Sequence, residues 1–329
     1  MAEHLYVAGG RQRGLRPLTA ALDWYQYEAG VLLRVDAEKG TATRQLEYVS
    51  PPEVIPDEGA TILFKSGSLA GDHLYMTTQT EVLIYRLPDF VLERHISIPQ
   101  FNDLHHVILG RDGSLVVAAT GMDMVFEIDL DGTILREHDV TGNGLWHRFS
   151  RDTDYRKVAT TKPHAAHPNY VFRLGDEIWA TRFEHRDAVS VVDPSRRIDI
   201  GVQRVHDGVV RGERIYFTTV DGHVAIANAQ SLTVDRVVDL TKSHPRETVL
   251  GWTRSIYPVD DRHAWVGFSR IRPTKFRENV GWVARGFRRD IGTHIGLYDL
   301  ESGECLQQIE LEKYGLSAVF GIYPVPPAP

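Results

Sequence analysis

The segment VFEIDLDGTILREHDV (125–140) contains an apolar strand, a short polar turn and a second strand. The same phrase occurs five more times, as VLLRVDAEKGTATRQLEYV (31–49), VLIYRLPDFVLERHISI (82–98), VSVVDPSRRIDIGV (189–202), VAIANAQSLTVDRVVDL (224–240) and IGLYDLESGECLQQIEL (295–311). Repeats of roughly 40–50 residues that contain only strands are typical of β-propeller blades. The sequence therefore predicts an all-β propeller, in which inner strands from distant parts of the chain meet around one axis.

The two ends of the chain are expected to share one blade. GIYPV (321–325) duplicates SIYPV (255–259), an inner strand, whereas EHLYVAG (3–9) resembles DHLYMTT (72–78), a second strand. The prediction is therefore one domain, residues 1–329, with six blades and a composite first blade. Its blades are placed at 316–325 with 4–49, 61–98, 103–140, 165–203, 205–240 and 250–311.

Two stretches are longer than the repeat requires, 141–166 and 269–290. The second carries seven Arg or Lys residues before Asp290 and one acid, Glu278. Long loops on a minimal repeat often cover a site on one face. A solvated basic loop is the alternative.

Composition excludes several classes of function. The formal net charge is −7, which gives no support for nucleic acid or an anionic membrane as partner. No apolar run reaches the roughly 20 residues of a membrane span, and the first residues lack a secretory signal pattern. Cys305 is the only cysteine, so no intramolecular disulfide forms, and no phosphate-binding loop indicates a nucleotide cofactor. We therefore expect a cytoplasmic protein; oligomeric state cannot be predicted.

A column of polar residues precedes the second strands. These strands begin their apolar runs at Leu74, Leu115, Ile178, Ile215 and Ala264. Nine residues before them stand Lys65, His106, Asn169, His206 and Ser255. Further polar residues lie next to this column, namely His105, His167, Asp207 and Arg254, and His164 lies in the loop that approaches it. Buried imidazoles are costly unless they are hydrogen-bonded or bound to something, so this channel mouth is the candidate site.

Three interpretations of the column remain open. In the first, His106, His167 and His206 bind a divalent metal, Zn, Mn or Fe, with Asn169 or His164 as fourth ligand. In the second, a channel histidine acts as a base without metal, while Lys65 or Arg254 stabilises negative charge. In the third, the histidines only hydrogen-bond inner-strand carbonyls.

Arginines outside the regular strands suggest an anionic ligand. The candidates for substrate binding are Arg148, Arg182, Arg270, Arg272 and Lys275. Arginine offers a planar fork to carboxylate, phosphate or sulfate. For Arg182 and Arg277, ion pairs with Glu184, Asp187 or Glu278 are the alternative.

The repeat resembles the six-bladed TolB-like and NHL-like propeller superfamily across the whole chain. Within it, LHHVILGRDGSLVVAA (104–119) followed by FEIDLDGTILREHDV (126–140) resembles a blade of the arylsulfotransferases, whose channel histidines and arginines handle sulfate. That resemblance implies roles for His106, His206 and Arg254. The chain is similarly close to metal-dependent propeller enzymes such as gluconolactonase-like hydrolases, streptogramin lyases and oligouronide lyases, although none of their ligand patterns maps onto it residue by residue.

The sequence thus favours an enzyme for a small carboxylated or sugar-derived anion, using metal-assisted lyase or hydrolase chemistry. His105 or His164 would move the proton, with Lys65 and Arg254 as further catalytic groups. The first alternative is a non-catalytic propeller that binds a ligand or protein partner on its basic face. The second is a metal-free histidine and arginine group-transfer enzyme.

Overall fold

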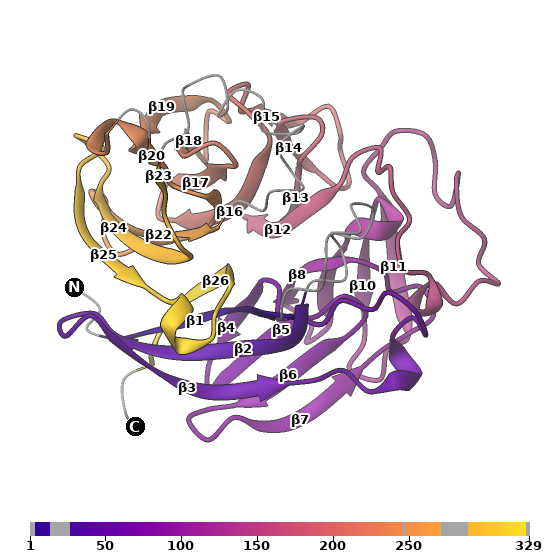
Figure 1. Ribbon diagram of the computed structural model, residues 1–329. Coiled ribbons are helices and arrows are strands. Elements are labelled where there is room, and N and C mark those ends of the chain that lie inside the picture. The colour runs from indigo at the N-terminus through magenta and orange to yellow at the C-terminus, as the bar shows by residue number, and fades with distance from the viewer. Residues whose placement is uncertain (1–3, 14–26, 246–247, 271–288, 327–329) are drawn as a thin grey trace.

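Six four-stranded antiparallel sheets follow one another around a ring (Figure 1). The computed structural model describes residues 4–13, 27–245, 248–270 and 289–326. The prediction of an all-β, six-bladed propeller is confirmed. Among the described residues, no helix has the length and apolarity that crossing a membrane requires.

Each blade runs from an inner strand near the axis to an outer strand at the rim. The first blade contains β26 (Ala318–Pro324), β1 (His4–Gln12), β2 (Tyr27–Asp36) and β3 (Thr41–Tyr48). The second contains β4 (Gly67–Ala70), β5 (His73–Thr77), β6 (Val82–Arg86) and β7 (Val91–Ile96). The third contains β8 (Leu104–Leu109), β9 (Leu115–Ala119), β10 (Met124–Ile128) and β11 (Ile134–Asp139).

The remaining blades repeat this order. The fourth contains β12 (Pro168–Leu174), β13 (Glu177–Arg182), β14 (Asp187–Ser190) and β15 (Arg197–Asp199). The fifth contains β16 (Val205–Arg211), β17 (Arg214–Thr219), β18 (His223–Asn228) and β19 (Val234–Asp239). The sixth contains β21 (Trp252–Pro258), β22 (His263–Ser269), β24 (His294–Asp299) and β25 (Cys305–Glu310). A short parallel pair, β20 (Thr248–Val249) and β23 (Arg289–Asp290), lies outside the blades.

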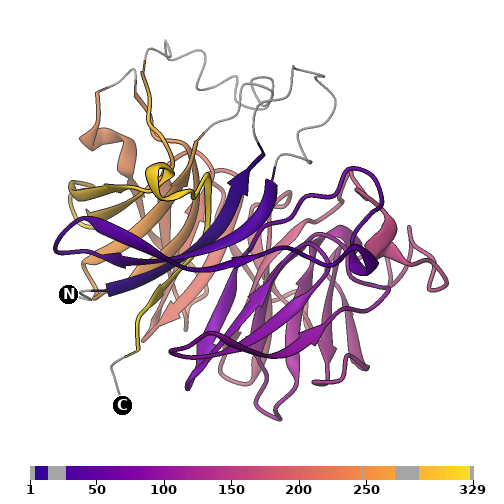
Figure 2. The same cartoon turned by 60° about the horizontal axis from the view of Figure 1, so that its bottom comes forward.

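The composite first blade closes the ring. β26 pairs antiparallel with β1, so that Leu5 lies opposite Pro324 and Gly10 opposite Ala318. The indigo N-terminal strands lie beside the yellow C-terminal strand in both views (Figures 1 and 2). Consecutive inner strands contact one another around the whole circle, from β26 through β4, β8, β12, β16 and β21 back to β26. Closure in this way pairs sheet edges that would otherwise recruit other chains.

The hydrophobic core lies between neighbouring blades. One cluster joins Val7 of the first blade to Trp265 of the sixth, and another joins Ile84 of the second to Phe126 of the third. β9 is buried along its whole length because its sheet is covered on both faces, which explains its continuous apolar sequence LVVAA. Outer strands such as β7 are largely exposed and carry charged residues that protect the edge.

Candidate functional site

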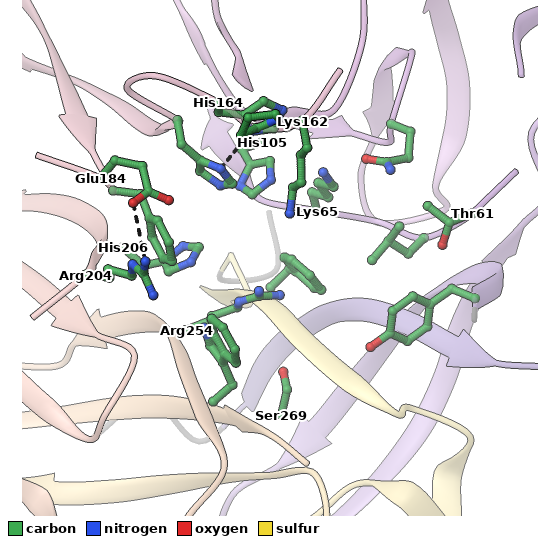
Figure 3. A pocket seen from close by; sticks show the side chains of 18 of the residues that line it. Thr61, Lys65, His105, Lys162, His164, Glu184, Arg204, His206, Arg254 and Ser269 are labelled. Atoms are coloured by element: carbon green, nitrogen blue, oxygen red, sulfur yellow. Dashed lines mark hydrogen bonds and ion pairs between the residues drawn. The ribbon is translucent and has the colours of Figure 1, made fainter. Parts of the chain in front are cut away.

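A pocket of about 630 Å³ opens at the end of the ring where the inner strands begin (Figure 3). Its polar wall includes four histidines, His105, His164, His167 and His206. The ring centroids of His105 and His167 are 5.1 Å apart, and those of His105 and His206 are 6.1 Å apart. Nδ1 of His164 lies 2.8 Å from Nδ1 of His167, which links the approaching loop to the wall.

The strand register explains which residues face this pocket. The residues paired with the starts of the second strands are Leu69, Leu109, Arg173, Val210, Pro258 and Pro324. Four positions before them lie Lys65, His105, Asn169, His206, Arg254 and Phe320. All of these except Asn169 line the pocket. The equivalent positions of the six blades therefore do converge at one mouth.

Bulges near these positions aim the side chains. The pairing of β8 with β9 shifts between Leu104 and His106, and that of β21 with β22 shifts between Arg254 and Ile256. β16 has a comparable shift after His206. A β-bulge bends its strand and redirects side chains, and such bulges are common beside functional sites.

His106 does not belong to the pocket, which corrects its predicted role as a metal ligand. Its Nε2 lies 3.0 Å from the carbonyl oxygen of Gly67, and its Nδ1 accepts a hydrogen bond from the amide of Val171 at 3.3 Å. Its ring stacks on Tyr170 with centroids 3.5 Å apart. Both nitrogens are therefore engaged by backbone, as the third interpretation expected for the whole column. The error arose because the hairpin after β8 is one residue longer than that after β4, so the pocket position is His105.

The variant His106→Leu is expected to lose about 2–4 kcal/mol of unfolding free energy, because Gly67 and Val171 lose their buried partner. Chemical denaturation measures this loss, and His147→Leu at an exposed position should stay within about 0.5 kcal/mol. Metal content, measured on tag-free protein, should be the same in wild type and His106→Leu. A metal that is lost with His106 would contradict the assigned packing role.

Asn169 also lies outside the pocket lining. Its side-chain amide donates to the carbonyl of Val205 at 2.9 Å, which ties the fourth blade to the fifth. His167, which directly precedes β12, contributes the pocket side chain of this blade instead. Its φ of 57° lies in the left-handed region, so the chain turns sharply here before the strand begins.

The predicted metal set is not brought together. His164, His167 and His206 line the pocket, whereas His106 and Asn169 do not. Both ring nitrogens of His106 and the amide nitrogen of Asn169 are engaged by backbone groups. Within the described ranges, no group of three or more His, Cys, Asp or Glu side chains is arranged to hold a metal ion.

A buried ion pair forms the floor beside the histidines. The ammonium of Lys65 contacts the carboxylate of Asp103, and Nε2 of His105 lies 3.5 Å from the same oxygen. Burial lowers the pKa of Lys65 to about 8, although Asp103 opposes that shift. Burial alone would raise the pKa of Asp103, but Lys65 and His105 together bring it well below its usual range. Asp103 was missed by the sequence reasoning, even though it lies only two residues before the predicted residue His105.

The pocket histidines are neutral near pH 7. Burial, helped by Lys65, lowers the pKa of His105 to about 3. Burial and Arg254 hold the pKa of His206 well below its usual range, and burial likewise lowers the pKa values of His164 and His167. Nε2 of His206 is buried and has no hydrogen-bond partner among the described residues. A buried nitrogen in this state is ready to accept or donate a hydrogen bond to a ligand.

Arg254 lies between the histidines of the pocket and two aromatic residues that also line it, Trp252 and Phe320. Its guanidinium carbon is 4.4 Å from the ring centroid of Phe320 and 5.3 Å from that of Trp252. Figure 3 shows its guanidinium directed toward the space that Lys65 and Lys162 also face. It therefore occupies the pocket position predicted for a catalytic cation.

The end of the 141–166 insertion lies over the pocket. Lys162, Pro163 and His164 line it. The carboxylate of Asp123 holds this segment by accepting hydrogen bonds from the backbone amides of Ala165, Ala166 and His167 at 2.8–2.9 Å. Asp123 therefore positions both loop histidines, and nothing in its local sequence indicated this.

Two predicted substrate-binding arginines have structural roles instead. Arg148 contacts Asp123 at 3.2 Å and the carbonyl of Thr161. Arg182 makes a two-pronged ion pair with Asp187 and donates to the carbonyl of Val140. Both arginines form ion pairs and hydrogen bonds within the protein, and neither lines the pocket.

Arg270 does line the pocket, where it also pairs with Glu312 at 2.9 Å. Arg272, Lys275 and Arg277 lie outside the described residues. Sequence reasoning missed Lys162 and Arg204, and the latter sits at the rim 3.5 Å from Glu184. The pocket-lining residues described therefore carry five cationic side chains, Lys65, Lys162, Arg204, Arg254 and Arg270, and one carboxylate, Glu184.

No family model and no curated protein matches the sequence. Similar solved structures include a protein of unknown function from Bacteroides caccae (TM-score 0.62, 11% identity, 98% of each chain) and the nidogen/laminin complex (TM-score 0.56, 10% identity, 97% of each chain). A virginiamycin B lyase from Staphylococcus aureus matches with a TM-score of 0.43 and 14% identity, over 72% of this chain and 73% of its own. At these identities the likeness concerns the fold, and it identifies the chain as a six-bladed β-propeller.

Proposed function

We propose that the protein is an enzyme that binds a small carboxylated anion in this pocket and transfers a proton by acid–base chemistry. The observation that carries the proposal is Nε2 of His206, a neutral ring nitrogen that has no hydrogen-bond partner among the described residues and lies in the same pocket as Lys65 and Arg254. A lyase or hydrolase reaction needs at least a base that takes a proton and a cation that stabilises the negative charge that develops. It also needs a second group that returns a proton.

Binding would depend on the surplus of positive charge. Lys65 and Arg254 are at the floor, and Lys162 reaches in from the loop (Figure 3). Charges in a buried pocket are only weakly screened, so an anion gains more there than at the surface. Burial is the main cause of the depressed pKa of His206, and Arg254 and Lys65 add to it; a bound carboxylate would offset the contribution of these cations and so make this histidine a better base when substrate is present.

The proton step follows from these positions. In a lyase reaction, His206 would take the proton from the carbon next to the carboxylate. Arg254 and Lys65 would stabilise the resulting negative charge, and a leaving group on the neighbouring carbon would depart with the electron pair. In a hydrolase reaction, His206 would take the proton of the attacking water instead. Asp103 would act as a positioning residue, because it holds both Lys65 and His105.

The proposal differs from the metal-assisted reaction expected from sequence. That expectation took His106, His167 and His206 as ligands with Asn169 or His164 as the fourth, and both ring nitrogens of His106 are hydrogen-bonded to backbone groups. The proposal therefore assigns no step to a metal, because His106 is engaged by backbone. Elemental analysis of tag-free protein is the direct check, since a stoichiometric metal that disappears in His206→Ala would favour the metal-assisted form.

The proposed step can be tested by exchange in D2O. Wild-type protein should exchange the proton next to the carboxylate of at least one of L-malate, D-glucuronate and mandelate, followed by proton NMR. His206→Gln should slow this exchange by about 100-fold or more, because it removes the base. Arg254→Gln should weaken binding of the same anion by about tenfold, whereas Arg214→Gln, at an exposed position, should not.

Three other outcomes of these experiments would contradict part of the proposal. Binding that needs Arg254 but gives no exchange with any probe would exclude the lyase step and leave either the hydrolase reaction or a non-catalytic propeller. Exchange that continues unchanged in His206→Gln would remove His206 as the base. If none of the anions binds, the anion site itself is refuted.

A further inference from the structure

We infer that the ligand of this pocket is an amphipathic anion, with a charged head at Lys65, Arg254 and His206 and a ring-shaped or branched apolar body. The body would lie against Tyr27, Leu63 and Phe320. This inference rests on the proposed anion site and adds the chemical class of the rest of the molecule.

The apolar wall is a distinct feature of the pocket. Tyr27, Leu63 and Phe320 all line it, and with Ala318 they form a hydrophobic cluster separate from the cores between the blades. Tyr27 begins β2 and Phe320 lies in β26, so two strands of the composite blade supply two of the three side chains.

Backbone contacts hold this wall in place. Residues 62–64 run beside the first blade, because the amide of Ile62 donates to Tyr27 at 3.0 Å and that of Phe64 donates to Gly9 at 3.1 Å. Gly10 lies beneath the wall, where an added Cβ would come within 2.8 Å of both Leu63 and Tyr27. The absence of a side chain at Gly10 therefore allows these two residues to approach the strand and face the pocket.

Arg254 joins the two halves of the site. Its guanidinium lies over the rings of Phe320 and Trp252, at 4.4 and 5.3 Å from their centroids. An anionic group bound by this guanidinium would lie next to the aromatic wall, so the same molecule can contact both.

The size of the pocket requires more than a small anion. Its volume of about 630 Å³ falls in the range of sites that enclose drug-sized ligands. A two- or three-carbon acid would leave the apolar wall in contact with water, and the gain from its burial would be lost. A sugar acid would place hydroxyl groups against Leu63 and Phe320, whose side chains cannot hydrogen-bond.

A single polar group can be accommodated at the far end. Oγ1 of Thr61 is buried, lines the pocket and has no hydrogen-bond partner among the described residues. In Figure 3 Thr61 lies on the side of the pocket opposite His206 and Glu184. One hydroxyl or carbonyl at the distal end of the ligand would satisfy it.

Matched probes test this class of ligand. Dissociation constants from ligand-observed NMR should be at least tenfold lower for phenylacetate and cyclohexylacetate than for acetate, because the added carbons are buried. D-Glucuronate should bind no better than acetate. In Leu63→Ala, the preference for phenylacetate over acetate should fall about fivefold, while the affinity for acetate stays the same. Phe320→Leu should lower the same preference, and because Phe320 also contacts Arg254 only the ratio of the two affinities is compared in that variant.

The ratio of the two affinities within one variant separates recognition from folding. Phe172→Leu, in a core outside the pocket, should lower stability without changing the ratio. Equal binding of acetate and phenylacetate, or a preference for glucuronate, would overturn the amphipathic ligand and leave the proposed anion site standing. If neither acetate nor phenylacetate binds to wild-type protein, the failure lies with the anion site.

Discussion

Lys65→Met is expected to lower the free energy of unfolding by about 3–5 kcal/mol, because it leaves the carboxylate of Asp103 buried without its partner. Side-chain exposure is 4% for Lys65 and 8% for Asp103, so water cannot replace the lost ammonium. Urea denaturation at neutral pH measures the loss.

The pH dependence of this loss has a defined sign. In the wild type, the pKa of Asp103 is depressed, so its contribution to stability is present above the unfolded pKa and lost as pH falls. Without Lys65, burial raises that pKa, and protonation at low pH removes the unpaired charge. The difference in unfolding free energy between wild type and Lys65→Met should therefore become smaller as pH falls through the acid range.

Two further variants test whether the loss of stability comes from the unpaired charge of Asp103 rather than from the removal of a lysine. Lys65→Met combined with Asp103→Asn should recover more than half of the loss, because the amide carries no charge. Asparagine also tolerates the φ of 49° at this position. Lys39→Met breaks an exposed pair with Asp36 and should leave the free energy of unfolding nearly unchanged, because solvent screens that pair. The ion pair would be unimportant if Lys65→Met were as stable as wild type. The same conclusion would follow if the difference in their unfolding free energies did not depend on pH.

Glu81→Leu is expected to have a similarly large effect, about 3–5 kcal/mol, at the junction of the first two blades. The carboxylate of Glu81 is fully buried and accepts hydrogen bonds from Tyr48, Ser50 and Thr78, and it also contacts Nε2 of His95 at 2.9 Å. Removing it leaves these groups without their acceptor. Glu81→Gln keeps the shape and one acceptor oxygen, so it should lose less than Glu81→Leu.

The Glu81 cluster should give stability an optimum in pH. Burial opposes ionisation of Glu81, but the donors, His95 first, lower its pKa, so its contribution is lost as pH falls through that value. The hydrogen bond to Glu81 raises the pKa of His95 in the folded protein. The stability that protonated His95 contributes is therefore fully present below the pKa of the unfolded state, near 6.5, and is lost as pH rises through the pKa of the folded state. Thermal unfolding against pH should show a flatter profile for Glu81→Leu, and an unchanged profile would contradict the assignment.

The repeating phrase was enough to predict the blades because strand alternation and turns are local properties. The composite first blade was also predictable, since SIYPV and GIYPV repeat the same inner strand. The pocket column was predicted correctly at Lys65 and His206, where the inner and second strands are separated by hairpins of equal length.

The column failed at His106 and Ser255 because the hairpins there are longer, and it failed at Asn169, whose hairpin has the expected length, because His167 supplies the pocket side chain of that blade. One extra residue after β8 and after β21 moved the pocket positions to His105 and Arg254, which a constant offset cannot detect. Asp103 and Phe320 were missed for another reason. Their contribution depends on contacts across blades, which appear only when the ring has closed.

The pairing of β1 with β26 has a consequence for the order of folding. The residues that complete the first blade are synthesised more than 300 positions after their partners. Contacts between such distant segments carry the largest loop-closure entropy and form slowly. On the ribosome, one edge of β1 stays unpaired while five blades emerge, so the nascent chain becomes resistant to aggregation at this edge only once β26 has been made.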